Sequence, residues 1–274
     1  MSQAAPSTTS TPSFESLAEA LDAAEQAGGT IDADLRASFT PSRAEGYEIQ
    51  KLRYSKWEKE PFVWKIGGSN VASQAVFETT EAFAGPVRPE YCIETKDDEV
   101  SVEFPKSHSG LAEVEVAVKT KRDISADDVS KVTNEDFESI HLAIEFPGSR
   151  LGFKPDGKTF GWLVADNSTS GSFVMGKAIP VEAHDSGNFS GFSGHKFRCY
   201  ADDELVAEAD GNALVKDPLA IARELLGPIT AQCGTLKAGS IISTGGITAG
   251  VPVGEAKEIR AEWSDVDILN VVRK

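Results

Sequence analysis

Residues 111–118, Leu-Ala-Glu-Val-Glu-Val-Ala-Val, constrain the fold of this chain more than any other segment. Their small and β-branched side chains favour a strand, and the two-residue period of a strand places Glu113 and Glu115 on one face. Neighbouring carboxylates repel each other, so this pairing calls for a compensating charge. A divalent cation would supply it, because Mg²⁺ and Mn²⁺ prefer oxygen ligands. The alternative is a solvent-facing pair on a half-exposed strand.

Two further residues extend this pattern. Glu145 lies in the apolar run of residues 141–146, His-Leu-Ala-Ile-Glu-Phe, and is the candidate third ligand from a separate strand. Lys65 lies inside a short apolar strand of residues 62–70 that opens into a glycine-rich turn. It either packs its stem at a sheet edge with the ammonium in water, or is a buried cation that faces an anionic ligand.

Length and composition indicate a soluble globular protein. The 274 residues can bury a large core in one domain, with or without a small appendage. No apolar run approaches the roughly 20 residues of a membrane span, and residues 1–13 lack the features of a signal peptide. The three widely spaced cysteines, Cys92, Cys199 and Cys233, indicate a reducing compartment and no zinc site. We therefore predict a cytoplasmic protein.

The net charge of −16 argues against nucleic acid and anionic membranes as partners, because both attract basic surfaces. It does not exclude a small anionic substrate. A bound metal and one lysine would provide the local positive charge that such a substrate needs.

The chain is expected to divide into three parts. Residues 1–13 are rich in Ser, Thr, Ala and Pro and predict a disordered leader; residues 14–85 predict a helical part, and residues 86–274 a β-rich catalytic domain. In the helical part we expect helices from Phe14 to the stop at Gly28, from the capping box of Ser42 and Glu45 to about Trp57, and over residues 71–83.

Beyond residue 86 the pattern predicts mostly strands. The expected strands are residues 91–94, 100–104, 112–118, 141–145, 160–164, 173–175, 196–201, 204–209, 240–244, 259–263 and 267–272. Helices are expected over residues 129–139 and over residues 218–226, where Asp217 is the N-cap.

Several segments, in a fixed order, carry a family resemblance. They are Lys65-Ile-Gly67, Glu113-Val-Glu115, residues 143–151 (Ala-Ile-Glu-Phe-Pro-Gly-Ser-Arg-Leu), residues 164–171 (Val-Ala-Asp-Asn-Ser-Thr-Ser-Gly) with Val174-Met-Gly176, Asp217-Pro-Leu219, and residues 236–245 (Leu-Lys-Ala-Gly-Ser-Ile-Ile-Ser-Thr-Gly) with Val251-Pro-Val253. From about Ala44 to the C-terminus, the chain resembles the hydratase/decarboxylase branch of the fumarylacetoacetate hydrolase superfamily, which includes the 2-keto-4-pentenoate (2-hydroxypentadienoate) hydratases.

The resemblance implies an α+β fold, a mixed β-roll with a smaller helical N-terminal part, in a homo-oligomer. It implies Mg²⁺ or Mn²⁺ bound by Glu113, Glu115 and Glu145, with Lys65 as acid/base or carboxylate partner. The further site residues that it implies are Asp166 and Asn167 as catalytic groups, and Gly67, Ser69, Ser168, Thr244 and Gly245 as substrate-binding groups. The Thr244 hydroxyl and the backbone N–H groups of the Thr244-Gly245 turn would hold the carboxylate of the substrate.

The implied reaction starts from a small 2-oxo or 2-hydroxydienoic acid and passes through a metal-bound enolate. Hydration is the first candidate; decarboxylation and tautomerisation share the same site, and a catalytically silent binding protein is a further alternative. If Lys65 is buried, its pKa should be lowered, which would let it exchange protons near neutral pH.

Two segments depart from the pattern of the hydratases. Gly68-Ser69-Asn70 replaces Leu-Thr-Ser after Lys-Ile-Gly, and residues 85–91, Gly-Pro-Val-Arg-Pro-Glu-Tyr, replace a Phe-Ala-Asp-Met loop. We therefore expect a substrate other than the usual pentadienoate. Hydrolysis is disfavoured, because none of the histidines begins the His-x-x-Glu pair of the hydrolases; these are His108, His141, His184 and His195.

Overall fold

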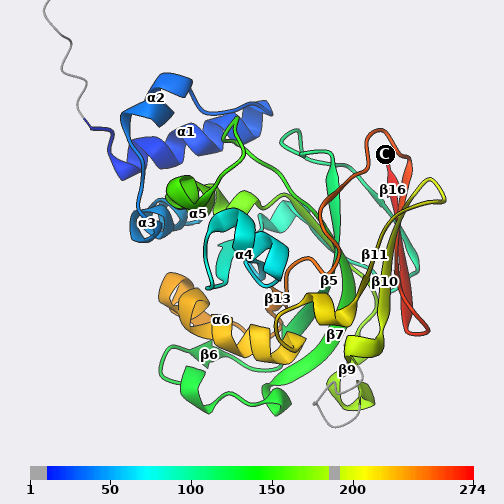
Figure 1. The fold of residues 1–274 in the computed structure, drawn as a ribbon. Helices are drawn as coiled ribbons and strands as arrows, with labels where there is room; N and C mark the ends of the chain where they lie inside the picture. Colours follow the sequence, from blue (N-terminus) through cyan, green and yellow to red (C-terminus); the bar gives the residue numbers. More distant parts are fainter. Residues whose placement is uncertain (1–10, 185–191) are drawn as a thin grey trace, which may run out of the picture.

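A computed structural model describes residues 11–184 and 192–274 of the chain (Figure 1). The described helices are α1 (Phe14–Ala27), α2 (Ala33–Ser38), α3 (Arg43–Tyr54), α4 (Val71–Phe77), α5 (Phe160–Ala165) and α6 (Pro218–Cys233). Helices α1, α2, α3 and α5 gather at one end of the molecule, and α6 lies across the β-rich part (Figure 1). The architecture is therefore α+β, as the sequence predicts.

The strands form a large mixed sheet, a five-stranded sheet and a small ribbon. The large sheet has the order β2 (Phe83–Pro86), β1 (Val63–Gly67), β13 (Ile241–Ser243), β5 (Leu111–Thr120), β7 (Phe137–Phe146), β8 (Ser172–Met175) and β3 (Cys92–Glu94), with β14 (Val251–Pro252) on β5 and β9 (Ile179–Pro180) on β7. The second sheet has the order β11 (Glu204–Asp210), β10 (Lys196–Ala201), β15 (Glu258–Trp263), β16 (Asp267–Arg273) and β4 (Glu99–Val102), and β12 (Thr235–Leu236) pairs with β6 (Ile124–Ser125).

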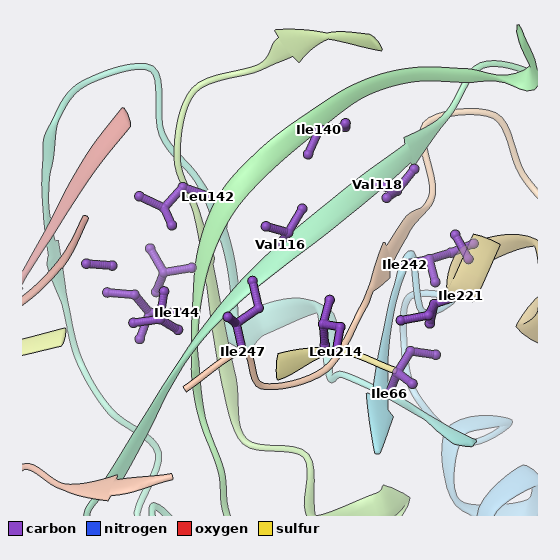
Figure 2. Close-up of a cluster of buried hydrophobic side chains, with 14 of the residues drawn as sticks. Ile66, Val116, Val118, Ile140, Leu142, Ile144, Leu214, Ile221, Ile242 and Ile247 are labelled. Atoms are coloured by element: carbon purple, nitrogen blue, oxygen red, sulfur yellow. The ribbon is translucent and has the colours of Figure 1, made fainter. Parts of the chain in front are cut away.

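One face of the large sheet carries the main hydrophobic core. Val116, Leu142 and Ile144 project from β5 and β7 on this face, as Figure 2 shows. They belong to one cluster with buried residues of α6 and of the five-stranded sheet, such as Ile221 and Ile259. The core therefore ties the two sheets and α6 together.

The opposite face of the large sheet carries a smaller apolar cluster. Val63, Ala117, Ala143 and Ile241 belong to it. Because side chains alternate between the faces of a strand, this is also the face of Glu113, Glu115, Glu145 and Lys65. A rigid, two-sided sheet thus fixes the backbone beneath all four groups.

Local sequence signals account for several of the helix and turn boundaries. Ser42 and Glu45 form the capping box at the start of α3, and Gly28 ends α1 with φ +69°. Asp202 and Asp203, with φ 45° and 69°, form the two-residue turn of the β10–β11 hairpin.

Other expectations are wrong. Residues 160–164 are helical, not a strand: every residue of α5 is buried, and a short, fully buried apolar run has no periodicity that separates helix from strand. Residues 129–139 hold two short 3₁₀ turns, after which β7 begins at Phe137, so no α-helix forms there. The helix over residues 71–83 ends at Phe77, α3 ends at Tyr54 instead of Trp57, α6 extends to Cys233, and α2 was not expected.

The division at residue 85 is a prediction about folding units. β1 precedes that residue and β2 spans it, yet both belong to the large sheet. Residues 1–10 of the expected leader lie outside the described residues, and Ser13 caps α1. Within residues 11–184 and 192–274, no helix combines the length and apolar character that crossing a bilayer requires.

Helices α3 and α5 cross at two glycines, where a methyl group has no room. A Cβ on Gly161 would overlap the Pro41 carbonyl oxygen, and one on Gly46 would overlap the Gly161 carbonyl oxygen. We predict that Gly161→Ala lowers the free energy of unfolding by about 1–3 kcal/mol through overpacking. Gly227→Ala in α6, where a Cβ meets nothing within 4 Å, is the matched control. It should be neutral or stabilise by up to about 1 kcal/mol in chemical denaturation, and equal losses in both variants would contradict this account.

Candidate functional site

Three carboxylates converge on the β5–β7 pair. Glu113 lies directly opposite Glu145 in the antiparallel register, and Glu115 lies two residues further along β5, opposite Ala143. One oxygen atom from each glutamate lies within 4.8 Å of the others. The side chains of Glu115 and Glu145 are fully buried. The arrangement is the one predicted from the spacing of the glutamates, and it excludes a solvent-facing pair.

Neighbouring residues shape this cluster from the side of β13. The Ser243 hydroxyl donates a hydrogen bond to Glu115 Oε2. A Cβ on Gly246 or on Gly250 would lie 2.9 or 2.7 Å from the Glu113 carboxylate oxygens, so a side chain at either position would displace this carboxylate. None of these three residues was predicted from the sequence as part of the site. Ser243 could have been found, because it precedes the recognised Thr244-Gly245 turn on the same predicted strand.

Lys65 is the cation of the site. Its ammonium lies 3.3 Å from Glu145 Oε2 and donates a hydrogen bond of 3.0 Å to the Ser168 carbonyl oxygen. The residue is only 6% exposed, so the alternative of an edge lysine with its ammonium in water is wrong.

The pKa values of the four groups reflect burial and mutual charge. Burial raises the pKa of Glu145 to about 7 and that of Glu115 well above its ordinary value. Burial alone would lower the pKa of Lys65, as the sequence analysis expected. The negative charges of Glu145, Glu113 and Glu115 outweigh burial, so the pKa of Lys65 is raised and that expectation is wrong.

The cluster fits a divalent cation on two observations. Glu115 Oε1 and Glu145 Oε1 are buried, and within the described part of the chain neither has a hydrogen-bond partner. When all groups are ionised, one ammonium faces three carboxylates, which leaves two negative charges uncompensated. Buried carboxylates in this situation bind protons or a metal ion.

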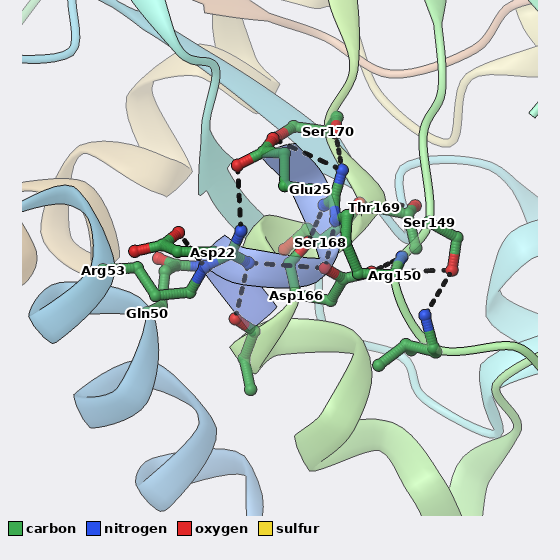
Figure 3. Close-up of polar contacts among 12 residues, drawn as sticks. Asp22, Glu25, Gln50, Arg53, Ser149, Arg150, Asp166, Ser168, Thr169 and Ser170 are labelled. Carbon is green, nitrogen blue, oxygen red and sulfur yellow. Dashed lines mark hydrogen bonds and ion pairs between the residues drawn. The ribbon is translucent and has the colours of Figure 1, made fainter. Parts of the chain in front are cut away.

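Asp166 lies beside the site but directs its carboxylate to two arginines, as Figure 3 shows. Arg150 Nε lies 2.5 Å and Arg53 Nη1 3.3 Å from Asp166 Oδ1, and all three side chains are fully buried. The contacts give Asp166 an ion-pairing role. Its direct participation in catalysis stays a prediction.

Asn167 and Ser168 follow in an unusual backbone conformation. Asn167, Ser168 and Thr169 have φ values of 51°, 56° and 58°, a left-handed run without glycine. The Ser168 hydroxyl donates to the Ala84 carbonyl oxygen, and the Ser168 carbonyl accepts from Lys65. Asn167 Oδ1 is buried and has no hydrogen-bond partner among residues 11–184 and 192–274.

In the Thr244-Gly245 turn, which is predicted to bind the carboxylate of a substrate, the hydrogen-bond donors bind other protein atoms. The Thr244 hydroxyl donates to the Val116 carbonyl oxygen, and the Gly245 N–H donates to Ser243 Oγ. The binding of a substrate by Thr244 and Gly245 stays a prediction. Ser69 Oγ is buried beside Gly245 and has no hydrogen-bond partner in the described residues.

Gly67 packs against Phe83, and its role in binding a substrate stays a prediction. A Cβ at this position would overlap the Phe83 ring. The glycine therefore lets β1 approach the aromatic cluster beneath it.

The fold is similar to that of solved structures. No protein-family model matches the sequence, and no curated protein matches it. The structure is similar to that of 4-oxalocrotonate decarboxylase from Pseudomonas putida G7 complexed with magnesium and adipate, with a TM-score of 0.76 and 20% identity over 95% of this chain and 97% of that one. The same enzyme complexed with calcium and acetate gives the same values.

A second structural neighbour carries the family description. A protein from Yersinia pestis CO92 assigned to the fumarylacetoacetate hydrolase family gives a TM-score of 0.51 and 15% identity over 77% of this chain and 92% of that one. The structural neighbours are thus fumarylacetoacetate hydrolase family members, and the chain has their fold. The expected fold is confirmed.

The raised pKa of Glu145 leads to a prediction about pH. In the metal-free protein this carboxyl binds its proton more tightly when folded than when unfolded. Its contribution to stability is therefore complete below about pH 4.5 and is lost as the pH rises to about 7. Thermal melts of metal-free protein should show this loss in the wild type and a flatter profile in Glu145→Gln.

Added Mn²⁺ extends the same test. Because protons compete with a metal for these oxygens, the rise in melting temperature on adding Mn²⁺ should be larger at pH 8 than at pH 6. A metal-induced rise that is independent of pH would contradict the assignment of a raised pKa to this site.

Proposed function

We propose that this protein is a member of the fumarylacetoacetate hydrolase superfamily and a metal-dependent lyase of a small 2-oxo acid. Glu113, Glu115 and Glu145 would hold Mg²⁺ or Mn²⁺. The observation that carries the proposal is a cluster of three carboxylates beside a single buried ammonium, in which Glu115 and Glu145 are buried and have oxygens without a hydrogen-bond partner in the described residues. When bound, the cation would act as a Lewis acid that stabilises negative charge on the C2 oxygen of the substrate.

Lys65 has the position of a proton donor. An ammonium has three N–H bonds. One is directed to the Ser168 carbonyl oxygen and the ion pair with Glu145 accounts for a second, which leaves one for a substrate. In the metal-free protein the three carboxylates raise the pKa of Lys65, and its ammonium would be the group that delivers a proton to the substrate carbon.

Two reactions, decarboxylation and hydration, are candidates for this site. Decarboxylation is supported by the similarity in fold to 4-oxalocrotonate decarboxylase, which extends over almost the whole of both chains. The structure of that enzyme is a complex with magnesium and the dicarboxylate adipate. Hydration, the first candidate from the sequence, is supported by the resemblance of the segments around Lys65 and Asp166 to the hydratases. Of the two, decarboxylation of a 2-oxo diacid has the broader support. Both use the same carboxylates and the same lysine.

Metal binding can be tested apart from turnover. We predict that Glu115→Gln lowers the affinity for Mn²⁺ in titration calorimetry by at least about tenfold, because it removes a charged ligand at constant volume. Glu138→Gln is the matched control, since Glu138 lies on β7 with Glu145 but is exposed. Equal Mn²⁺ affinity in the wild type and Glu115→Gln would refute the metal site.

Measurements of turnover test the role of Lys65 and identify the reaction. We predict that Lys65→Met keeps its affinity for Mn²⁺ and loses on the order of a hundredfold or more in kcat, the range of general acid–base catalysis. NMR analysis of products from 2-oxo diacids and 2-hydroxydienoates identifies the reaction. Release of CO₂ indicates decarboxylation, and a new hydroxyl at C4 indicates hydration. A fully active Lys65→Met would remove Lys65 from the mechanism.

A further inference from the structure

The left-handed run of residues 167–169 is held at both ends by one buried side chain, Arg150 (Figure 3). At the start of the run, Arg150 Nε donates to Asp166 Oδ1 at 2.5 Å and Arg150 Nη2 donates to the Asp166 carbonyl oxygen at 2.6 Å. At its end, Arg150 Nη1 donates to the Ser170 carbonyl oxygen at 2.8 Å. The planar guanidinium thus spans the whole run.

The hydrogen bonds of Arg150 to both ends of the run have a physical purpose. L-residues other than glycine rarely adopt positive φ, and three in succession persist only where their surroundings impose that conformation. Thr169 is the clearest case, because a β-branched residue is the least suited to it. The fork of an arginine suits the task, since its N–H groups point in fixed directions and bind two acceptors at once.

The run, in turn, supplies the hydrogen-bond acceptor for Lys65. The Ser168 carbonyl oxygen accepts from Lys65 Nζ at 3.0 Å. The run is also fastened to β2, the neighbour of β1, because the hydroxyls of Ser168 and Ser170 donate to the carbonyl oxygens of Ala84 and Pro86. Gly85, which pairs with Lys65, leaves the space that the Asn167 carbonyl occupies.

We propose that Arg150 is a positioning residue for Lys65. It holds residues 167–169 in the left-handed conformation, so that the Ser168 carbonyl draws the ammonium away from a closed ion pair with Glu145 and sets the direction of its free proton. This inference rests on the proposed function, because it assigns Arg150 an effect on turnover through Lys65. Arg150 does not touch the carboxylate cluster through any contact in the described residues.

The test compares Arg150→Lys with Arg260→Lys. Both keep the charge, and each arginine pairs with a carboxylate, but Arg260 lies on β15 and has no hydrogen bond to residues 166–170 within the described part of the chain. For Arg150→Lys we expect kcat to fall on the order of a hundredfold, as for a misplaced catalytic group. The KM and the Mn²⁺ affinity should stay unchanged. Arg260→Lys should retain the wild-type kcat.

Hydrogen exchange supplies a readout that does not depend on turnover. The Thr169 and Ser170 N–H groups donate within the run, to the carbonyl oxygens of Asp166 and Asn167. Peptides that cover them should exchange faster in Arg150→Lys and not in Arg260→Lys. If kcat and exchange are both unchanged in Arg150→Lys, or only one of them changes, the inference is wrong. Absence of turnover in the wild type would instead refute the proposed function.

A second variant keeps the test decisive if Arg150→Lys folds poorly. Thr169→Gly removes the side chain that resists positive φ and leaves the Ser168 carbonyl in place. The double variant Arg150→Lys/Thr169→Gly should regain at least part of the lost kcat and the slow exchange. A double variant no better than Arg150→Lys in both readouts would show that Arg150 acts only on general stability.

Discussion

The antiparallel register of β5 and β7 places Glu113 directly opposite Glu145, with Glu115 on the same face. Like charges across a strand pair destabilise a sheet, and burial of Glu115 and Glu145 increases the cost. The rest of the site follows from this constraint. Lys65, the Ser243 hydroxyl and the glycines around Glu113 each reduce the cost or leave space, and together they still leave negative charge for a cation to neutralise.

A second group of buried charged residues is balanced in charge, in contrast to the carboxylate cluster. Its arginines and carboxylates match in number and bind one another closely; the members are Asp22, Glu25, Asp166, Arg53, Arg88 and Arg150. Such networks add little net stability, but losing one partner costs about 3–5 kcal/mol. This network joins α1 and α3 to the segment that follows α5, and so connects the helical end of the molecule to the acceptor of Lys65 (Figure 3).

The sequence predicts the carboxylate cluster well, because a strand has a fixed period and the two glutamates of β5 are neighbours in sequence. It predicts α5 wrongly, because a short segment buried on all sides has no polar face to reveal its period. It also could not reveal that Arg53 and Arg150 meet at Asp166, since Arg53 is separated from Asp166 by 113 positions. The direction of the Lys65 pKa failed for a related reason: burial was considered without the three carboxylates that surround the ammonium.

The central claim is that these three glutamates form one metal site. It is tested most directly by anomalous diffraction from crystals of the protein soaked with Mn²⁺. The account predicts a single strong anomalous peak within bonding distance, about 2.1–2.2 Å, of oxygen atoms from Glu113, Glu115 and Glu145. A peak that touches none of the three, or no peak while Lys65 and Glu145 stay paired, would contradict it.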